Sequence, residues 1–128
     1  MIYLDSSVVL SQFLADNRPL PKAITEDSLV SSRLLEYEIW NRIHARGLTR
    51  SHADEVHAVL ERVLLIDLTP SVLARALKPF PVSVRTLDGL HLATIEHLRA
   101  GGDYIELASF DRRLVAGAGA LGVAIFAL

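Results

Sequence analysis

Four acidic side chains of this sequence could act together, although they lie far apart along the chain. They are Asp5, Glu38, Asp88 and Asp111. Carboxylates that converge on one point repel each other, and a hard divalent cation with oxygen ligands, Mg²⁺ or Mn²⁺ rather than Zn²⁺, relieves that repulsion. Such a site can hydrolyse a phosphodiester bond, because the ion activates bound water and neutralises charge on the phosphate.

Each acid taken alone also has a simpler explanation. Asp5 and Asp111 could cap the helices that follow them, and Asp88 in a first helical turn suits the positive end of the helix macrodipole. Glu38 could pair with Arg42, one helical turn further on. The hypothesis of a shared site therefore depends on the joint placement of the four acids.

The second acid has a rival in Glu36, two residues before Glu38. On a helical wheel Glu38 falls near Asn41 and Arg42, whereas Glu36 falls near apolar positions. These polar neighbours favour Glu38, but the helix is apolar around much of its circumference, and the pattern leaves both glutamates open.

Apolar runs that predict strands alternate with helical patterns along the whole chain. The expected strands cover residues 2–4, 28–31, 64–68, 104–110 and 122–128, and the expected helices cover 6–15, 32–46, 51–63, 70–78, 87–100 and 111–121. Thr69 and Thr86 are predicted caps, Gly47 is predicted to end a helix, and residues 16–25 are expected to form a loop.

This alternation predicts an α/β fold in three layers. The strands are apolar on both faces, as expected of a short, mostly parallel sheet covered by helices on both sides. Ligands of such sheets bind beyond the carboxyl ends of the strands, where Asp5 and Asp111 are expected to lie. We expect residues 1–128 to form a single domain.

The composition of the chain excludes several classes of functional site. The chain has 128 residues, 51% hydrophobic, a net charge of −2 and no cysteine. The absence of cysteine excludes a thiol nucleophile and a thiolate metal site, and near-neutral charge argues against a general nucleic-acid binder. The opening MIYLDSSVVL lacks a basic leader, and no apolar run approaches the roughly 18–20 residues of a membrane span. We therefore expect a cytoplasmic protein without a membrane partner.

Several segments together resemble the PIN-domain ribonucleases, and among them the VapC toxins of bacterial toxin–antitoxin pairs. The segments are MIYLDSSVV, VSSRLLEYEIWNRI, LDGLHLAT, and ELASFDRRL followed by AGALGV. The resemblance covers nearly the whole chain and places the four acids of the family at Asp5, Glu38, Asp88 and Asp111. It departs from the family pattern at Ser6, where threonine is frequent.

This resemblance implies a three-layer PIN-like fold and endonucleolytic cleavage of RNA that depends on Mg²⁺ or Mn²⁺. It also implies a homodimer and inhibition by a cognate VapB-type antitoxin. All four acidic positions of the pattern are filled, so nothing in the resemblance suggests an inactive enzyme.

Other side chains near the acids could assist or simply fold the chain. Ser6 and Ser109 could orient ligands or cap helices, and Arg42 could support the site from the helix of Glu38. His91 shares a helix face with Asp88 and either touches the site or packs in the core. Arg112 and Arg113 follow Asp111 and could contact the RNA backbone.

Two other functions compete with a nuclease. A catalytically silent PIN-like module could bind RNA or protein without cutting it. A phosphoacceptor domain would need a lysine near the last strand, and neither Lys22 nor Lys78 lies there. The G-x-G-x-x-G string from Gly117 to Gly122 does not open a helix after a strand, so we interpret it as a closely packed helix rather than a dinucleotide site.

Overall fold

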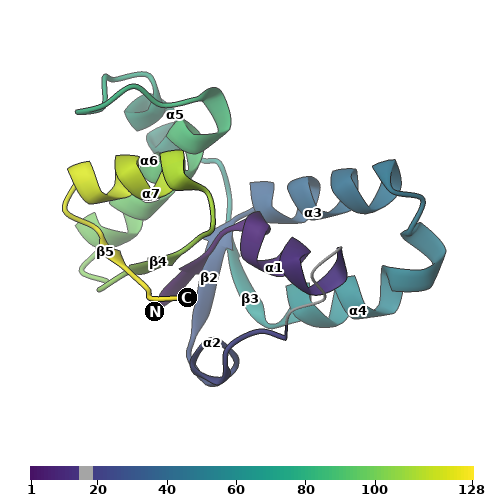
Figure 1. Cartoon of the computed structure of the whole chain (residues 1–128). Coiled ribbons are helices and arrows are strands. Elements are labelled where there is room, and N and C mark those ends of the chain that lie inside the picture. The colour runs from purple at the N-terminus through teal and green to yellow at the C-terminus, as the bar shows by residue number, and fades with distance from the viewer. Residues whose placement is uncertain (15–18) are drawn as a thin grey trace.

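A five-stranded sheet forms the centre of the computed structural model, which describes residues 1–14 and 19–128 (Figure 1). The strand order is β3-β2-β1-β4-β5, and each neighbouring pair is parallel. The strands are β1 (Ile2–Leu4), β2 (Leu29–Ser32), β3 (Val63–Ile66), β4 (Glu106–Ala108) and β5 (Ala124–Ile125). The expected α/β fold is therefore confirmed, with a sheet that is parallel at every pairing rather than at most of them.

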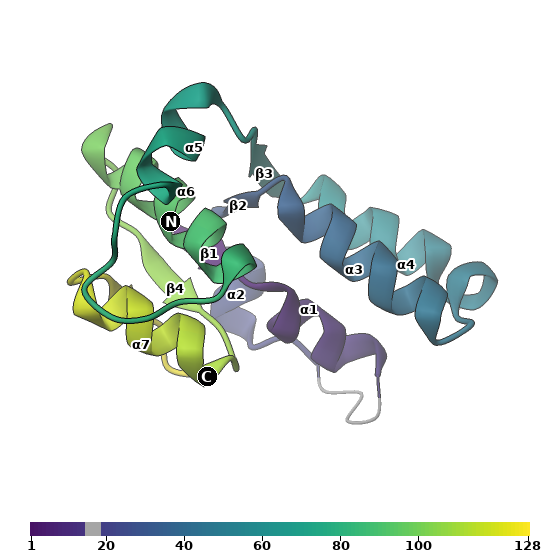
Figure 2. The same ribbon diagram turned by 90° about the horizontal axis from the view of Figure 1, so that it is seen from above.

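Helices cover both faces of this sheet. They are α1 (Ser6–Phe13), α2 (Lys22–Glu26), α3 (Leu34–Ala45), α4 (Thr49–Glu61), α5 (Pro70–Ala76), α6 (Thr86–Ala100) and α7 (Arg112–Ala120). Helices α1, α3 and α4 lie on one side, and α5, α6 and α7 lie on the other (Figure 2). None of the helices described is long and apolar enough to cross a bilayer.

The central strand β1 contributes to two separate cores because successive side chains of a strand point to opposite faces. Ile2 and Leu4 pack in the core beneath α1 and α3. Tyr3 packs in the core beneath α6 and α7. All three side chains are almost wholly excluded from solvent, so β1 is fixed from both sides.

The order of the strands puts a topological switch next to β1. From β1 the chain first adds β2 and β3 on one side, and then adds β4 and β5 on the other. Crevices for ligands form at such switch points, beyond the carboxyl ends of the strands. Asp5 follows β1 directly and Asp111 is the N-cap of α7 after β4, so both acids lie at this edge of the sheet.

Most predicted helix ends have the expected local chemistry. Asp5 caps α1 by accepting a hydrogen bond from the backbone N–H of Ser7, and Thr69 caps α5 by accepting one from Val72. Gly47 has φ of 68°, the left-handed conformation that glycine adopts without strain after a helix. Thr86 was predicted as a cap, but Arg85 holds that position and Thr86 is the first residue of α6.

The prediction of a loop over residues 16–25 is wrong at its end, where α2 begins at Lys22. Pro21, with φ of −53°, precedes this short helix, and the buried side chain of Ile24 anchors it in the core. Residues 15–18, which include the end of the predicted first helix and the start of that loop, lie outside the described part of the chain.

Strand and helix boundaries also differ from the prediction. The strand expected over 104–110 is limited to Glu106–Ala108, and the one expected over 122–128 is limited to Ala124–Ile125. Strands of a parallel ladder extend only as far as their partners, and β1 offers β4 three residues. The helix expected from Ser32 begins at Leu34, because β2 continues through Ser32.

The glycine-rich string is part of a closely packed helix, as predicted. A Cβ atom at Gly117 would lie 2.8 Å from Leu92 Cδ1 and 3.3 Å from Val84 Cγ1, whereas one at Gly119 would meet no described residue within 4 Å. Gly117 therefore permits α7 to approach α6, and Gly119 has no such role.

The two glycines predict opposite effects of alanine on stability. Gly119→Ala should raise the free energy of unfolding by about 0.5–1 kcal/mol, the difference in helix propensity between the two residues. Gly117→Ala should instead be destabilising, because overpacking costs about 1–3 kcal/mol and exceeds that gain. Urea unfolding of the two variants checks this, and equal stabilisation by both would contradict it.

Candidate metal centre

All four predicted acids line one cavity of about 630 Å³ at the carboxyl ends of β1 and β4. Its lining includes Asp5, Glu38, Asp88 and Asp111, together with Ser6, Ser7 and Arg42. The four acids come from the turn after β1, from α3, from α6 and from the N-cap of α7. The fold thus brings together side chains that the sequence separates widely.

Asp5 is buried, with 5% of its surface exposed, and a set of hydroxyl groups fixes its carboxylate. Its Oδ2 atom accepts hydrogen bonds from Ser7 Oγ at 2.5 Å and from Ser109 Oγ at 2.8 Å, besides the capping bond from Ser7 N. Among the described residues every hydrogen bond of this carboxylate is to Oδ2, which leaves Oδ1 for a ligand.

Ser7 joins the two sides of the topological switch, a role that sequence reasoning missed. Its Oγ donates to Asp5 and accepts from the backbone N–H of Phe110 at 2.9 Å. Ser109, which the sequence did single out, accepts from the backbone N–H of Asp111 at 2.9 Å while it donates to Asp5. The only signal for Ser7 was its place two residues after a capping aspartate.

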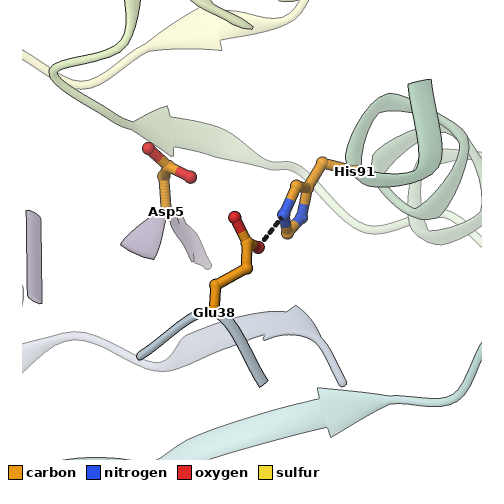
Figure 3. Close-up of side chains that lie close together, drawn as sticks. All are labelled: Asp5, Glu38 and His91. Carbon is orange, nitrogen blue, oxygen red and sulfur yellow. Dashed lines mark hydrogen bonds and ion pairs between the residues drawn. The ribbon is translucent and has the colours of Figure 1, made fainter. Parts of the chain in front are cut away.

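Glu38, rather than Glu36, faces the cavity. Its Oε1 lies 2.5 Å from His91 Nε2 (Figure 3). Its Oε2 accepts a hydrogen bond from Ser6 Oγ at 3.3 Å. Glu36 instead pairs with Arg33 at the surface, at 3.4 Å. Within the described part of the chain Glu38 pairs with His91, which forms an ion pair when the ring is protonated, and Arg42 lines the cavity without joining this pair.

His91 is 1% exposed and contacts both the site and the core. Its Nδ1 lies 2.7 Å from the hydroxyl oxygen of Tyr3, which sequence reasoning did not connect with the site. Burial alone lowers the pKa of His91, but the hydrogen bond and charge of Glu38, with the charges of Asp5 and Asp88, outweigh burial and raise it. Ligand atoms of Asp5, Glu38 and His91 all lie within 4.8 Å of one another.

Asp88 is the least satisfied of the acids. It is 8% exposed, and its Oδ2 atom has no hydrogen-bond partner among the described residues. Burial raises its pKa above the usual range of an aspartate, and the nearby charges of Asp111 and Asp5 raise it further. A buried carboxylate without a partner must gain a proton or a cation.

Asp111 and the two arginines after it lie at the exposed start of α7. The Oδ1 atom of Asp111 caps this helix by accepting hydrogen bonds from the backbone N–H groups of Arg113 and Leu114. Asp111 nevertheless lines the cavity, so capping and a place in the site do not exclude each other. Arg112 and Arg113 are exposed and are not lining residues of the cavity.

These donors fit a hard divalent cation. Carboxylate oxygens from several elements converge, and the buried Oδ2 of Asp88 lacks any other partner within the described chain. Mg²⁺ and Mn²⁺ prefer such oxygen ligands, and a divalent charge would offset the repulsion among the acids. Asp5, Glu38 and His91 offer ligand atoms within 4.8 Å of one another, and Asp88 and Asp111 line the same cavity.

The sequence is similar to that of known proteins over nearly its whole length. The family model described as "PIN domain" matches residues 2–119. A relative named Ribonuclease VapC46, from Mycobacterium tuberculosis (strain ATCC 25618 / H37Rv), is 34% identical over 131 aligned residues. This alignment covers 98% of the present chain and 96% of the relative.

We expect the carboxylate of Asp88 to lower the stability of the metal-free protein and to contribute to metal binding. Asp88→Asn should raise the melting temperature of the metal-free protein at pH 7, because the folded state then no longer holds this carboxylate ionised. A carboxyl whose pKa is raised by folding destabilises the protein at pH values above its unfolded pKa, and this cost disappears as the pH falls. The advantage of the variant should therefore shrink between pH 7 and pH 4.

Thermal unfolding with and without Mg²⁺ measures both effects. Saturating Mg²⁺ should stabilise the wild-type protein, by about 2.7 kcal/mol at a hundred times the Kd, and should stabilise Asp88→Asn much less. Asp103→Asn, at an exposed site after α6, is the matched control. If Asp88→Asn is less stable than the wild-type protein at pH 7 without metal, this account of Asp88 is contradicted.

Proposed function

The chain belongs to the PIN-domain family, and from this premise we propose that it is a metal-dependent endoribonuclease that acts as the toxin of a toxin–antitoxin pair. The single observation that carries the proposal is that Asp5, Glu38, Asp88 and Asp111 line one cavity in which a buried carboxylate has no partner among the described residues. The likeness to a relative named as a ribonuclease supports the same activity.

The proposed ion is Mg²⁺, with Mn²⁺ as its substitute. When bound, it would supply positive charge to the scissile phosphate and lower the pKa of an attacking water. The residues of the chain would orient the reactants around it. Asp5 is fixed by Ser7 and Ser109, and Glu38 is fixed by His91 and Ser6, so two carboxylates are held in place before any substrate arrives.

We propose unpaired RNA as the substrate, because its backbone and bases are accessible to an open cavity. Arg112 and Arg113 would contact phosphates from the start of α7, beside Asp111. Arg42, which lines the cavity, would meet a phosphate nearer to the site of cleavage.

The remaining parts of the proposal follow from the VapC-type relative. We propose a cognate VapB-type antitoxin as the partner that inhibits the enzyme, a homodimer as its assembly, and the cytoplasm as its place of action. We further propose that residues 1–128 act as one PIN domain, since the family model covers residues 2–119.

Two glutamates on one helix turn provide the decisive test of the nuclease. Glu38→Gln and Asp5→Asn should each lower the kcat for cleavage of a single-stranded RNA by at least about 100-fold, because each removes a carboxylate from the proposed metal site. Glu36→Gln should leave kcat within a factor of about 2, because a surface ion pair contributes little. Cleavage is measured with purified protein in Mg²⁺ and in Mn²⁺.

The same assay separates the nuclease from a catalytically silent binding module. RNA cleavage that is unchanged in Asp5→Asn would show that the activity arises elsewhere. RNA binding by the wild-type protein, without cleavage in either metal, would favour the silent module.

A further inference from the structure

A chain of hydrogen bonds runs from the middle of the sheet to the carboxylate of Glu38. The backbone N–H of Ser32 in β2 lies 3.1 Å from the hydroxyl oxygen of Tyr3 in β1. The same oxygen lies 2.7 Å from His91 Nδ1 in α6, and His91 Nε2 lies 2.5 Å from Glu38 Oε1 in α3. Tyr3 and His91 are at most 1% exposed, so water does not compete for these bonds.

The direction of each bond follows from what its atoms can do. A backbone amide only donates, so the Tyr3 oxygen accepts from Ser32 and keeps its own hydrogen to donate. With Tyr3 donating this hydrogen to His91, the accepting atom is a bare Nδ1. The ring hydrogen of a neutral His91 is then on Nε2, where it is donated to the carboxylate of Glu38.

Other protonation states lead to the same conclusion for Nε2. A doubly protonated His91 also carries a hydrogen on Nε2. A bare Nε2 would face the carboxylate oxygen of Glu38 at 2.5 Å with no hydrogen between the two acceptor atoms, and they would repel each other. The nitrogen nearest the cavity therefore has no free electron pair for a metal.

From this geometry we propose that His91 is a positioning residue, which holds Glu38 in the ligand orientation, and that Tyr3 in turn sets the ring hydrogen of His91. The inference rests on the proposed metal-dependent activity and restricts its ligand set. His91 lies within 4.8 Å of Asp5 and Glu38 and could be taken for a third ligand. The hydrogen bonds assign it instead to the support of Glu38, so the ion is bound by carboxylates.

Two oxygens of one carboxylate are held by different helices in this arrangement. His91 of α6 binds Oε1, and Ser6 of α1 donates to Oε2. The side chain of Glu38 is long and has three rotatable bonds, so without these partners it would lose the orientation toward Asp5 seen in Figure 3.

The ring nitrogens of His91 can be observed directly by NMR correlation of ring hydrogens and nitrogens, assigned by comparison with His91→Gln. In the metal-free protein Nε2 should carry a hydrogen, and saturating Mg²⁺ should leave that hydrogen in place; at a pH where the ring is neutral, Nδ1 should be bare. A bare Nε2 in the metal-free protein, or loss of its hydrogen on addition of Mg²⁺, would overturn the inference.

Kinetics and metal binding test the positioning role itself. His91→Leu should lower Mn²⁺ affinity, or kcat, by about 10–100-fold, the usual effect of removing a group that orients a ligand, while the KM for RNA changes little. His91→Gln, which keeps an N–H donor, should recover part of the loss. Tyr3→Phe should cause a smaller defect in the same direction, and Tyr104→Phe, at a site 69% exposed, should cause none.

The outcomes separate this inference from the proposed function. Unchanged Mn²⁺ affinity and kcat in both His91→Leu and Tyr3→Phe, at a temperature where each is folded, would overturn the positioning role. A wild-type protein that neither binds Mn²⁺ nor cleaves RNA would overturn the proposed function. In that case the NMR measurement of the ring nitrogens of His91 in the metal-free protein still tests the hydrogen bonds among Tyr3, His91 and Glu38.

Discussion

Repulsion among partly buried carboxylates is the constraint on which the arrangement of this protein depends. Asp5, Glu38, Asp88 and Asp111 share one cavity, and the Oδ2 of Asp88 has no partner among the described residues. A chain that optimised stability alone would pair or expose these groups. The carboxylates of this cavity repel each other and lower the stability of the fold, and a bound cation would offset that repulsion. Functional sites of proteins often carry such a cost in stability.

The rest of the fold can be understood as the support of this site. Strand β1 is fixed between two cores by Ile2 and Leu4 on one face and Tyr3 on the other, so Asp5 leaves the sheet at a defined point. Ser7 and Ser109 then tie the ends of β1 and β4 together across the topological switch. These serines lie at the topological switch of the parallel sheet. Ligand crevices of such sheets form at this point, where neighbouring connections leave the sheet in opposite directions.

Sequence reasoning predicted the features that local patterns determine and missed those that long-range contacts determine. The alternation of strands and helices, the caps at Asp5, Thr69 and Asp111, and the left-handed Gly47 followed from residue types near each position.

Helix α2 was missed because the burial of Ile24 against distant residues stabilises it. Ser7 and Tyr3 were missed because their partners Phe110 and His91 are about ninety to a hundred positions away. Glu38 could be preferred to Glu36 only weakly, since the helix gives no hint of which side meets α6. The roles of the site residues stay predictions.

One measurement tests the central claim most directly: the anomalous scattering of Mn²⁺ in crystals of the wild-type protein. The account predicts a peak in the cavity, about 2.0–2.2 Å from carboxylate oxygens of Asp5 and Glu38, as expected for a small hard cation with oxygen ligands. It also predicts that the peak is absent from crystals of Asp5→Asn. Strong Mn²⁺ density elsewhere in a protein that cleaves RNA, with none between these carboxylates, would contradict it.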